Sequence, residues 1–148
     1  MNLKERITDD MKAAMRARDS ERLSAIRYLL AAIKQREVDE RIEIDDAGVL
    51  AIIEKLLKQR RDGLSQFQSA GRQDLVDKEA FEIDLLEAYL PAPLSEAEVA
   101  SAIDDAIRVS GAAGPKDMGR VMAVLRPKLA GRADIAKVSS LVKARLPA

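Results

Sequence analysis

The sequence predicts an all-α protein with an N-terminal four-helix domain and a small C-terminal three-helix domain. Apolar residues recur three or four positions apart along almost the whole chain, which is the spacing of an amphipathic helix. No window alternates apolar and polar residues as a half-buried strand would. Pro91 and Pro93 interrupt the helical pattern and stiffen a short connector. We therefore expect a helical domain over 1–90, a proline linker over 91–94 and a second domain over 95–148.

Four apolar stripes predict the helices of the first domain. The stripes are Leu3, Ile7, Met11, Ala14 and Met15; Leu23, Ile26, Leu30 and Ile33; Val49, Ile53, Leu56, Leu57, Leu64 and Phe67; and Val76, Ile83, Leu86 and Leu90. Asp19 or Ser20 is expected to cap the second helix, because short polar side chains satisfy the free amides of a first turn. Gly71 is expected just beyond the third helix. The fourth helix should run over about 73–90.

Three further stripes predict the helices of the second domain. They are Val99, Ile103 and Ile107; Met118, Val121, Met122, Leu125 and Leu129; and Ile135, Val138, Leu141, Val142 and Leu146. Ser95 and Glu98 have the spacing of a capping box, which marks a helix start. Gly111 should close that helix, and Pro115 suits the first turn of the next. Gly119 is expected to let two helices pack closely, since glycine within a helix costs about 1 kcal/mol relative to alanine.

Composition excludes several classes of chemistry. The chain has no histidine and no cysteine, so it has no imidazole base, no thiol nucleophile, no disulfide and no His/Cys zinc site. Its longest stretch without a charged residue is the nine residues 63–71, too short to cross a membrane. The N-terminus has no apolar segment of the secretory type. We therefore expect a cytoplasmic protein.

No arrangement of residues predicts an active site. Adjacent carboxylates occur at 9–10, 45–46 and 104–105, but neighbours on a helix point about 100° apart and do not converge as an acid/base pair must. The segment 111–116 is superficially similar to a phosphate-binding loop, yet it lacks the glycine before the lysine and the following Ser/Thr. We expect no catalytic residue, no cofactor and no metal.

Charge is unevenly distributed along the chain, although 25 basic and 25 acidic residues balance overall. Residues 1–90 have a net charge of −3 and residues 91–148 a net charge of +3. The excess of positive charge is concentrated after Pro115, where the sequence contains eight lysines and arginines but only two aspartates. Such a surface is typical of polyanion binding, with a solvated helical face as the alternative. The candidate nucleic-acid-binding residues are Lys116, Arg120, Arg126, Lys128, Arg132, Lys137, Lys143 and Arg145.

Two details refine this interpretation. Lys116 and Arg132 lie near the predicted starts of the last two helices, where a cation is unusual unless an anion binds there. All four aromatic residues precede the proline linker, so the basic domain offers no platform on which unpaired bases could stack. If this domain binds RNA, it should therefore contact the phosphates and recognise the shape of the RNA, without reading unpaired bases. A second basic run, at Lys55, Lys58, Arg60 and Arg61, is expected to be solvated.

Several strings resemble the GatB/YqeY family over nearly the whole chain. The C-terminal strings are 116–122, 127–128, 131–134 and 138–146, and the N-terminal ones are 27–34, 58–61, 70–75 and 82–91. The resemblance implies a helical N-terminal domain followed by a small three-helix domain. In the B subunit of aspartyl/glutamyl-tRNA amidotransferase a similar tail domain touches the outer corner of tRNA. Similar domains are attached to some glutaminyl-tRNA synthetases.

The family is also associated with carbon–nitrogen ligase activity that uses glutamine as the amide donor. This sequence argues against carrying that activity over, because it has neither an amidase signature nor an ATP-binding motif. We expect a non-catalytic, tRNA-associated accessory protein in translation, whose basic C-terminal face binds backbone phosphates near the tRNA elbow. One alternative is an accessory component of a glutamine-dependent amidotransferase, and another is an adaptor that binds proteins alone. The expected partners are tRNA and an amidotransferase or aminoacyl-tRNA synthetase, with no membrane.

Overall fold

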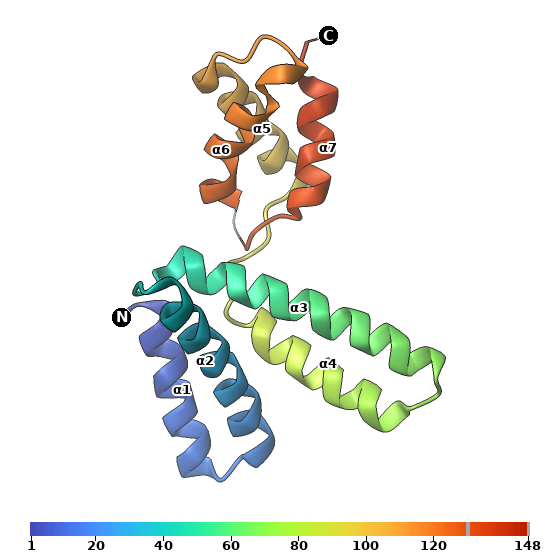
Figure 1. The fold of residues 1–148 in the computed structure, drawn as a ribbon. Helices are drawn as coiled ribbons and strands as arrows, with labels where there is room; N and C mark the ends of the chain where they lie inside the picture. Colours follow the sequence, from blue (N-terminus) through green and yellow to red (C-terminus); the bar gives the residue numbers. More distant parts are fainter. Residues whose placement is uncertain (130, 148) are drawn as a thin grey trace. The chain divides into compact units, whose positions relative to one another are not determined.

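The computed structural model describes residues 1–129 and 131–147, and within them every regular element is a helix (Figure 1). The predicted all-α class is confirmed. Close backbone contacts group the chain into two compact units, Met1–Leu90 and Pro91–Ala148, which we call the N-unit and the C-unit. That these units fold as separate domains of four and three helices stays a prediction.

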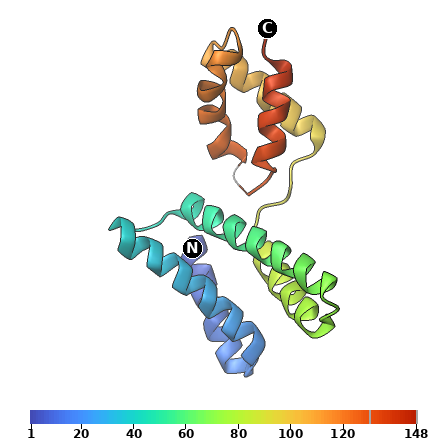
Figure 2. The same ribbon diagram turned by 45° about the vertical axis from the view of Figure 1, so that its right-hand side comes forward.

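The N-unit is built from two helical hairpins, one of α1 and α2 and one of α3 and α4 (Figure 2). The bounds are Leu3–Ala17 for α1, Ser20–Glu40 for α2, Asp46–Ser69 for α3 and Gln73–Glu87 for α4. One apolar core joins them, in which Ile7, Ile26, Leu29, Ile53 and Leu57 are almost fully excluded from solvent. Where two of these residues share a helix, they are three or four positions apart, so the helical period of 3.6 residues accounts for their common place in the core.

Local signals set most helix ends in the N-unit. Asp19 caps α2 by accepting the backbone N–H of Arg22, which confirms one of the two predicted caps. Gly71 lies just beyond α3 with φ +70°, as predicted. Helix α4 ends at Glu87, three residues before the predicted end. The amides of Tyr89 and Leu90 each bond the carbonyl three residues back, which tightens the chain ahead of the proline and ends the α-helix.

Two helix ends in this unit were not predicted. Both α1 and α2 finish on an arginine in the left-handed conformation, Arg18 and Arg41, each with φ 55°. A side chain with a Cβ atom is strained there, and glycine is the usual occupant. These two positions therefore lower the stability of the unit relative to glycine.

The basic run on α3 is only partly solvated, so that prediction is wrong for Arg60. Its Nη1 lies 2.8 Å from Glu82 Oε2 and 3.4 Å from Glu79 Oε1, and its guanidinium carbon lies 4.9 Å from the centroid of the Tyr28 ring. Both carboxylates come from α4, so Arg60 joins α3 to α4. The neighbouring Arg61 forms an exposed pair with Glu87 on α4 instead, with 2.8 Å between Nη2 and Oε1.

The C-unit packs three helices around a smaller core. They are α5, Glu96–Ser110; α6, Met118–Leu129; and α7, Ile135–Arg145, with a 3-10 turn at Pro115–Asp117 ahead of α6. The core is formed by Val99, Ile103, Ala106, Val121, Met122, Leu125, Leu129, Val138, Val142 and Leu146. These are mainly residues of the three predicted stripes.

The predicted ends of α5 are confirmed. Ser95 Oγ accepts the backbone N–H of Glu98 at 3.1 Å, and Glu98 Oε1 accepts that of Ser95 at 3.3 Å, which is a complete capping box. Gly111 closes the helix with φ +68°. Pro115 begins the 3-10 turn, as expected for a residue with no N–H to satisfy.

Gly119 does not serve close helix packing, and that interpretation is wrong. A Cβ atom placed on Gly119 would meet no atom of another residue within 4 Å, apart from its immediate surroundings in the helix. The glycine therefore lies on an open side of α6. Its cost to the helix is not repaid by contacts within the described part of the chain.

Candidate nucleic-acid interface

The eight predicted cations are spread over all of the C-unit after α5. Lys116 lies in the 3-10 turn, three cations lie on α6, Arg132 lies between α6 and α7, and three lie on α7. All are exposed except Arg132, which is half-buried. Three of the eight are engaged within the unit and five are not. The five whose side chains have no hydrogen bond or ion pair to the described residues are Lys116, Arg126, Lys128, Lys137 and Lys143.

Two of the engaged cations form ion pairs with aspartates. Arg120 Nη2 lies 2.7 Å from Asp117 Oδ1, and Arg145 Nη1 lies 2.6 Å from Asp104 Oδ1 on α5. The first pair spans one helical turn and could be found from its spacing. The second joins α7 to α5. Each pair already neutralises its guanidinium, so neither arginine presents a full free charge to a ligand.

Arg132 has a structural role in this unit. Its Nε donates to the carbonyl of Ala92 at 3.2 Å, and its own carbonyl accepts the N–H of Leu94 at 2.9 Å. These two bonds fasten the proline connector to the segment ahead of α7. The sequence suggested that Arg132 bound an anion, but one of the five N–H donors of its guanidinium is already directed at this chain.

The start of α6 is already occupied by a carboxylate. Asp117 accepts the backbone N–H of Ala113 at 2.9 Å as well as the Arg120 guanidinium. The Ala113 amide, and then Arg120, hold the pKa of Asp117 down at about 2. Its negative charge beside Lys116 disfavours a phosphate at this helix end, so Lys116 has to reach an anion through its side chain alone.

The clearest grouping of free cations lies along the seam between α6 and α7. Ser139 Oγ lies 3.9 Å from Met122 Sδ, which shows which side of each helix faces the other. Arg126 follows Met122 by four residues and Lys143 follows Ser139 by four, so each lies one turn further along the same side of its helix. The two helices run in opposite directions (Figure 1), so these cations lie at opposite ends of the seam.

Two residues with small side chains lie along the seam between these cations. Gly119 precedes Met122 by three residues and Ala136 precedes Ser139 by three, so both also lie along the seam. Neither has a side chain long enough to rise above the backbone. At 1.5 Å per residue, the two four-residue offsets separate Arg126 and Lys143 by about 12 Å along the helix axes. A phosphodiester strand could approach the helices closely here and meet a cation at each end.

Two other kinds of functional feature, a metal site and a membrane-spanning helix, are not found among the described residues. Among them, no three acidic side chains are gathered in a way that could hold a metal ion. No helix in the same part of the chain combines the length and the apolar character needed to cross a bilayer. The cations of the C-unit remain the candidate site.

Comparison with known proteins gives matches along most of the chain. The YqeY-like protein family matches residues 4–146. The protein named "Altered inheritance of mitochondria protein 41, mitochondrial" from Eremothecium gossypii is 41% identical over 102 residues, covering 68% of this chain and 56% of the relative. Its counterpart from Kluyveromyces lactis is 39% identical, covering 58% and 47%. That from Saccharomyces cerevisiae YJM789 is 37% identical, covering 55% and 44%. The chain thus spans about half the length of these relatives.

These names correct one expectation. The prediction of a plain cytoplasmic protein is wrong, because the curated relatives are named as mitochondrial proteins. The lack of an apolar N-terminal segment speaks only against a secretory signal. Import signals for mitochondria are amphipathic and rich in arginine, so the absence of an apolar segment does not bear on them.

The helical fold, the strings noted in the sequence and the match over 4–146 lead to one conclusion: the chain belongs to the YqeY-like protein family.

Proposed function

We propose that this chain is a non-catalytic accessory protein that binds the backbone of tRNA along the seam between α6 and α7. One observation carries the proposal: the side chains of Arg126 and Lys143 have no hydrogen bond or ion pair to the described residues, and they lie at opposite ends of the seam. Free cations attract phosphates at less cost than paired ones, because no existing ion pair has to be broken. Lys116, Lys128 and Lys137 would extend the contact to neighbouring phosphates.

Gly119 supports the same assignment. An exposed glycine in a helix lowers stability by about 1 kcal/mol, and no packing among the described residues explains it. Glycine is common where a ligand comes close to the backbone, because no Cβ atom stands in the way. A sugar–phosphate strand along the seam would use this space.

The test is binding of total tRNA to the full chain across a salt series. The double variant R126Q/K143Q should lower affinity and reduce the slope of log K against log salt by about 2, since each lost phosphate contact removes about 1. R108Q is the matched control, because Arg108 is exposed on α5 of the same unit, is paired with Asp105 and lies outside the seam. It should change affinity less than about twofold. Absence of saturable binding at low salt, or equal losses in all variants, would refute the proposal.

A second variant separates binding from stability. Gly119→Ala should raise the free energy of unfolding by about 0.5–1 kcal/mol, because alanine favours the helix and meets no neighbour. The same variant should weaken tRNA binding, because the methyl group fills the seam. A purely structural role for Gly119 would leave binding unchanged.

We propose that amide transfer, where this protein takes part in it, is performed by a glutamine-dependent partner enzyme. The chain has no cysteine or histidine to act as a nucleophile or base for that chemistry. The measurement is the rate of tRNA-dependent amide transfer by such an enzyme with and without this chain. A transferase rate from this chain alone would refute the non-catalytic assignment.

We further propose that the C-unit is a domain that folds alone and holds the whole binding surface. A fragment over 91–148 should unfold cooperatively on heating and bind tRNA with the affinity of the full chain. A fragment over 1–90, with its net charge of −3, should not bind. Binding that needs both fragments would refute this division of roles.

A further inference from the structure

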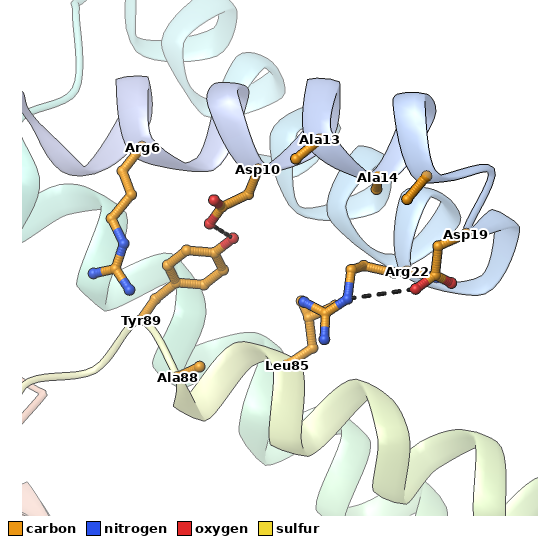
Figure 3. Close-up of a pocket in the computed structure, with 10 residues that line it drawn as sticks. Arg6, Asp10, Ala13, Ala14, Asp19, Arg22, Leu85, Ala88 and Tyr89 are labelled. Atoms are coloured by element: carbon orange, nitrogen blue, oxygen red, sulfur yellow. Dashed lines mark hydrogen bonds and ion pairs between the residues drawn. The ribbon is translucent and has the colours of Figure 1, made fainter.

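The N-unit contains a groove of about 450 Å³ that the proposed tRNA site does not use. Its walls are α1, the first turn of α2 and the C-terminal end of α4 (Figure 3). The volume lies within the usual range of about 300–1,000 Å³ for ligand pockets. It is large enough to receive an apolar side chain together with part of the backbone that carries it.

Small side chains on facing helices leave this space open. Ala13, Ala14 and Ala17 line it from α1, and Ala88 lines it from the end of α4. An alanine has no atoms beyond Cβ, so the helices are not bridged by side chains along this stretch. Leu85 adds an apolar surface from α4. The floor of the groove is therefore apolar and unfilled.

The carboxylates at the groove are already satisfied by this chain. Asp10 Oδ2 accepts the hydroxyl of Tyr89 at 2.6 Å, and Tyr89 itself is buried. Asp19 Oδ1 accepts the amide of Arg22 at the helix start, and Asp19 Oδ2 lies 3.7 Å from the Arg22 guanidinium. Burial and the bond to Asp10 raise the pKa of Tyr89, so the phenol keeps its proton and remains a donor to Asp10.

The cations at the groove are left with free donors. The guanidinium carbon of Arg6 lies 5.2 Å from the centroid of the Tyr89 ring, and this guanidinium has no hydrogen bond or ion pair to any described residue. The ring holds the guanidinium in place without using its N–H groups. The exposed Arg22 is paired only through the long Asp19 contact. The rim therefore holds two arginines and two aspartates, of which the Arg6 guanidinium keeps its N–H donors free while Asp10 accepts from Tyr89 and Asp19 from Arg22.

We propose that this groove binds a segment of a partner protein in which an apolar side chain is flanked by an aspartate or glutamate. The apolar side chain would cover the alanines and Leu85. The carboxylate would accept from the Arg6 guanidinium, and a second acidic residue could pair with Arg22. The proposal assigns a protein-binding role to the N-unit, separate from the tRNA-binding role proposed for the C-unit.

The test is a selection on the immobilised full chain from a display library of random 12-residue peptides. Enriched peptides should share an apolar residue within four positions of an acidic one. The best of them is then titrated against the wild type by fluorescence anisotropy. Arg6→Gln should weaken it about tenfold, as expected for loss of a charge-assisted hydrogen bond. Ala13→Leu should abolish binding by filling the groove, and leucine keeps the helix intact because it is a good helix former.

Arg16→Gln is the matched control. Arg16 is exposed on the same helix, has no ion pair with the described residues and does not line the groove. It should leave the affinity unchanged. Melting temperatures of all three variants establish that they are folded.

Several results would overturn the proposal. They are enrichment of peptides without acidic residues, no enrichment above background, and equal affinity of the wild type, Arg6→Gln and Ala13→Leu. Hexanoate serves as a further probe, because it has the alkyl chain and the acid but no peptide. If hexanoate bound as tightly as the selected peptide, the groove would be a site for small carboxylates and the assignment to a protein partner would fail.

Discussion

Replacing Arg60 with methionine tests whether the cluster between α3 and α4 holds the N-unit together. The side chain of Arg60 is 23% exposed, and those of Glu79 and Glu82 are 11% and 12% exposed. Methionine keeps an apolar stem against Tyr28 but removes the guanidinium. The variant leaves two nearly buried carboxylates with no cation between them.

The magnitude follows from this partial burial. Removing one partner of a fully buried ion pair costs about 3–5 kcal/mol, because the remaining charge is uncompensated. Arg60 keeps some access to water, so we expect a loss of about 2–3 kcal/mol in the free energy of unfolding. Arg61→Met is the control one residue away. Its pair with Glu87 is exposed on both sides, so its loss should be at most about 0.5 kcal/mol.

The assay is urea unfolding followed by circular dichroism at pH 7. A triple variant in which Arg60, Glu79 and Glu82 all become methionine should recover to within about 1 kcal/mol of the wild type, since apolar replacement of a buried charge cluster is often neutral. Equal losses for R60M and R61M would refute the reasoning. So would a triple variant that stays as unstable as R60M, because the cost would then not come from the unpaired carboxylates.

Three further predictions concern protonation and the backbone. Burial, and more weakly Glu79, raise the pKa of Glu82 above its ordinary 4.5, so the folded state keeps this proton where the unfolded state has lost it. The free energy of unfolding should therefore fall as the pH rises above 4.5. Measured by urea unfolding between pH 4 and 8, it should depend less on pH in Glu82→Gln than in the wild type. An equal dependence in the two proteins would contradict this. Asp117 has its pKa lowered from 3.8 to about 2, so its contribution to stability is complete above pH 3.8 and is lost as the pH falls toward 2. Its carboxyl carbon should titrate by NMR with a midpoint near 2, and a midpoint of 3.8 would exclude the bond to Ala113. Arg18→Gly and Arg41→Gly should each raise the free energy of unfolding by about 0.5–1 kcal/mol, because φ is 55° at both sites; a loss of stability on chemical denaturation would show that the arginine side chains matter more than the backbone strain.

Features that depend on neighbours in the sequence were predictable. The Ser95 and Glu98 capping box, the Asp19 cap and the glycine after α3 each involve residues within one turn, so their spacing alone identifies them. Helix periodicity likewise identified most of the core, although Met15 and Leu141 are exposed and the fully buried Leu29 was missed. The early end of α4 was missed because periodicity continues to Leu90, whereas the following proline tightens the last turn.

Features that join distant segments were not predictable from one sequence. Asp10 and Tyr89 are 79 residues apart, and nothing near either residue indicates their bond. Arg60 looked solvated because its partners lie on another helix. For the candidate site, the sequence supplied the eight cations, but it could not separate the five free ones from those that pair within the unit. It also could not indicate that the seam lies beside Gly119, because that depends on which sides of α6 and α7 meet.

The bonds from the proline connector to Arg132 determine where the chain can be cut. A fragment that begins at Ser95 would lack the Ala92 carbonyl that Arg132 Nε uses and the Leu94 amide that bonds the Arg132 carbonyl. Its loop ahead of α7 would be open to trypsin at Arg132, whereas a fragment that begins at Pro91 keeps both bonds. Affinity tags and fusion partners therefore belong before Pro91, and the first residues of the connector are part of the unit that follows them.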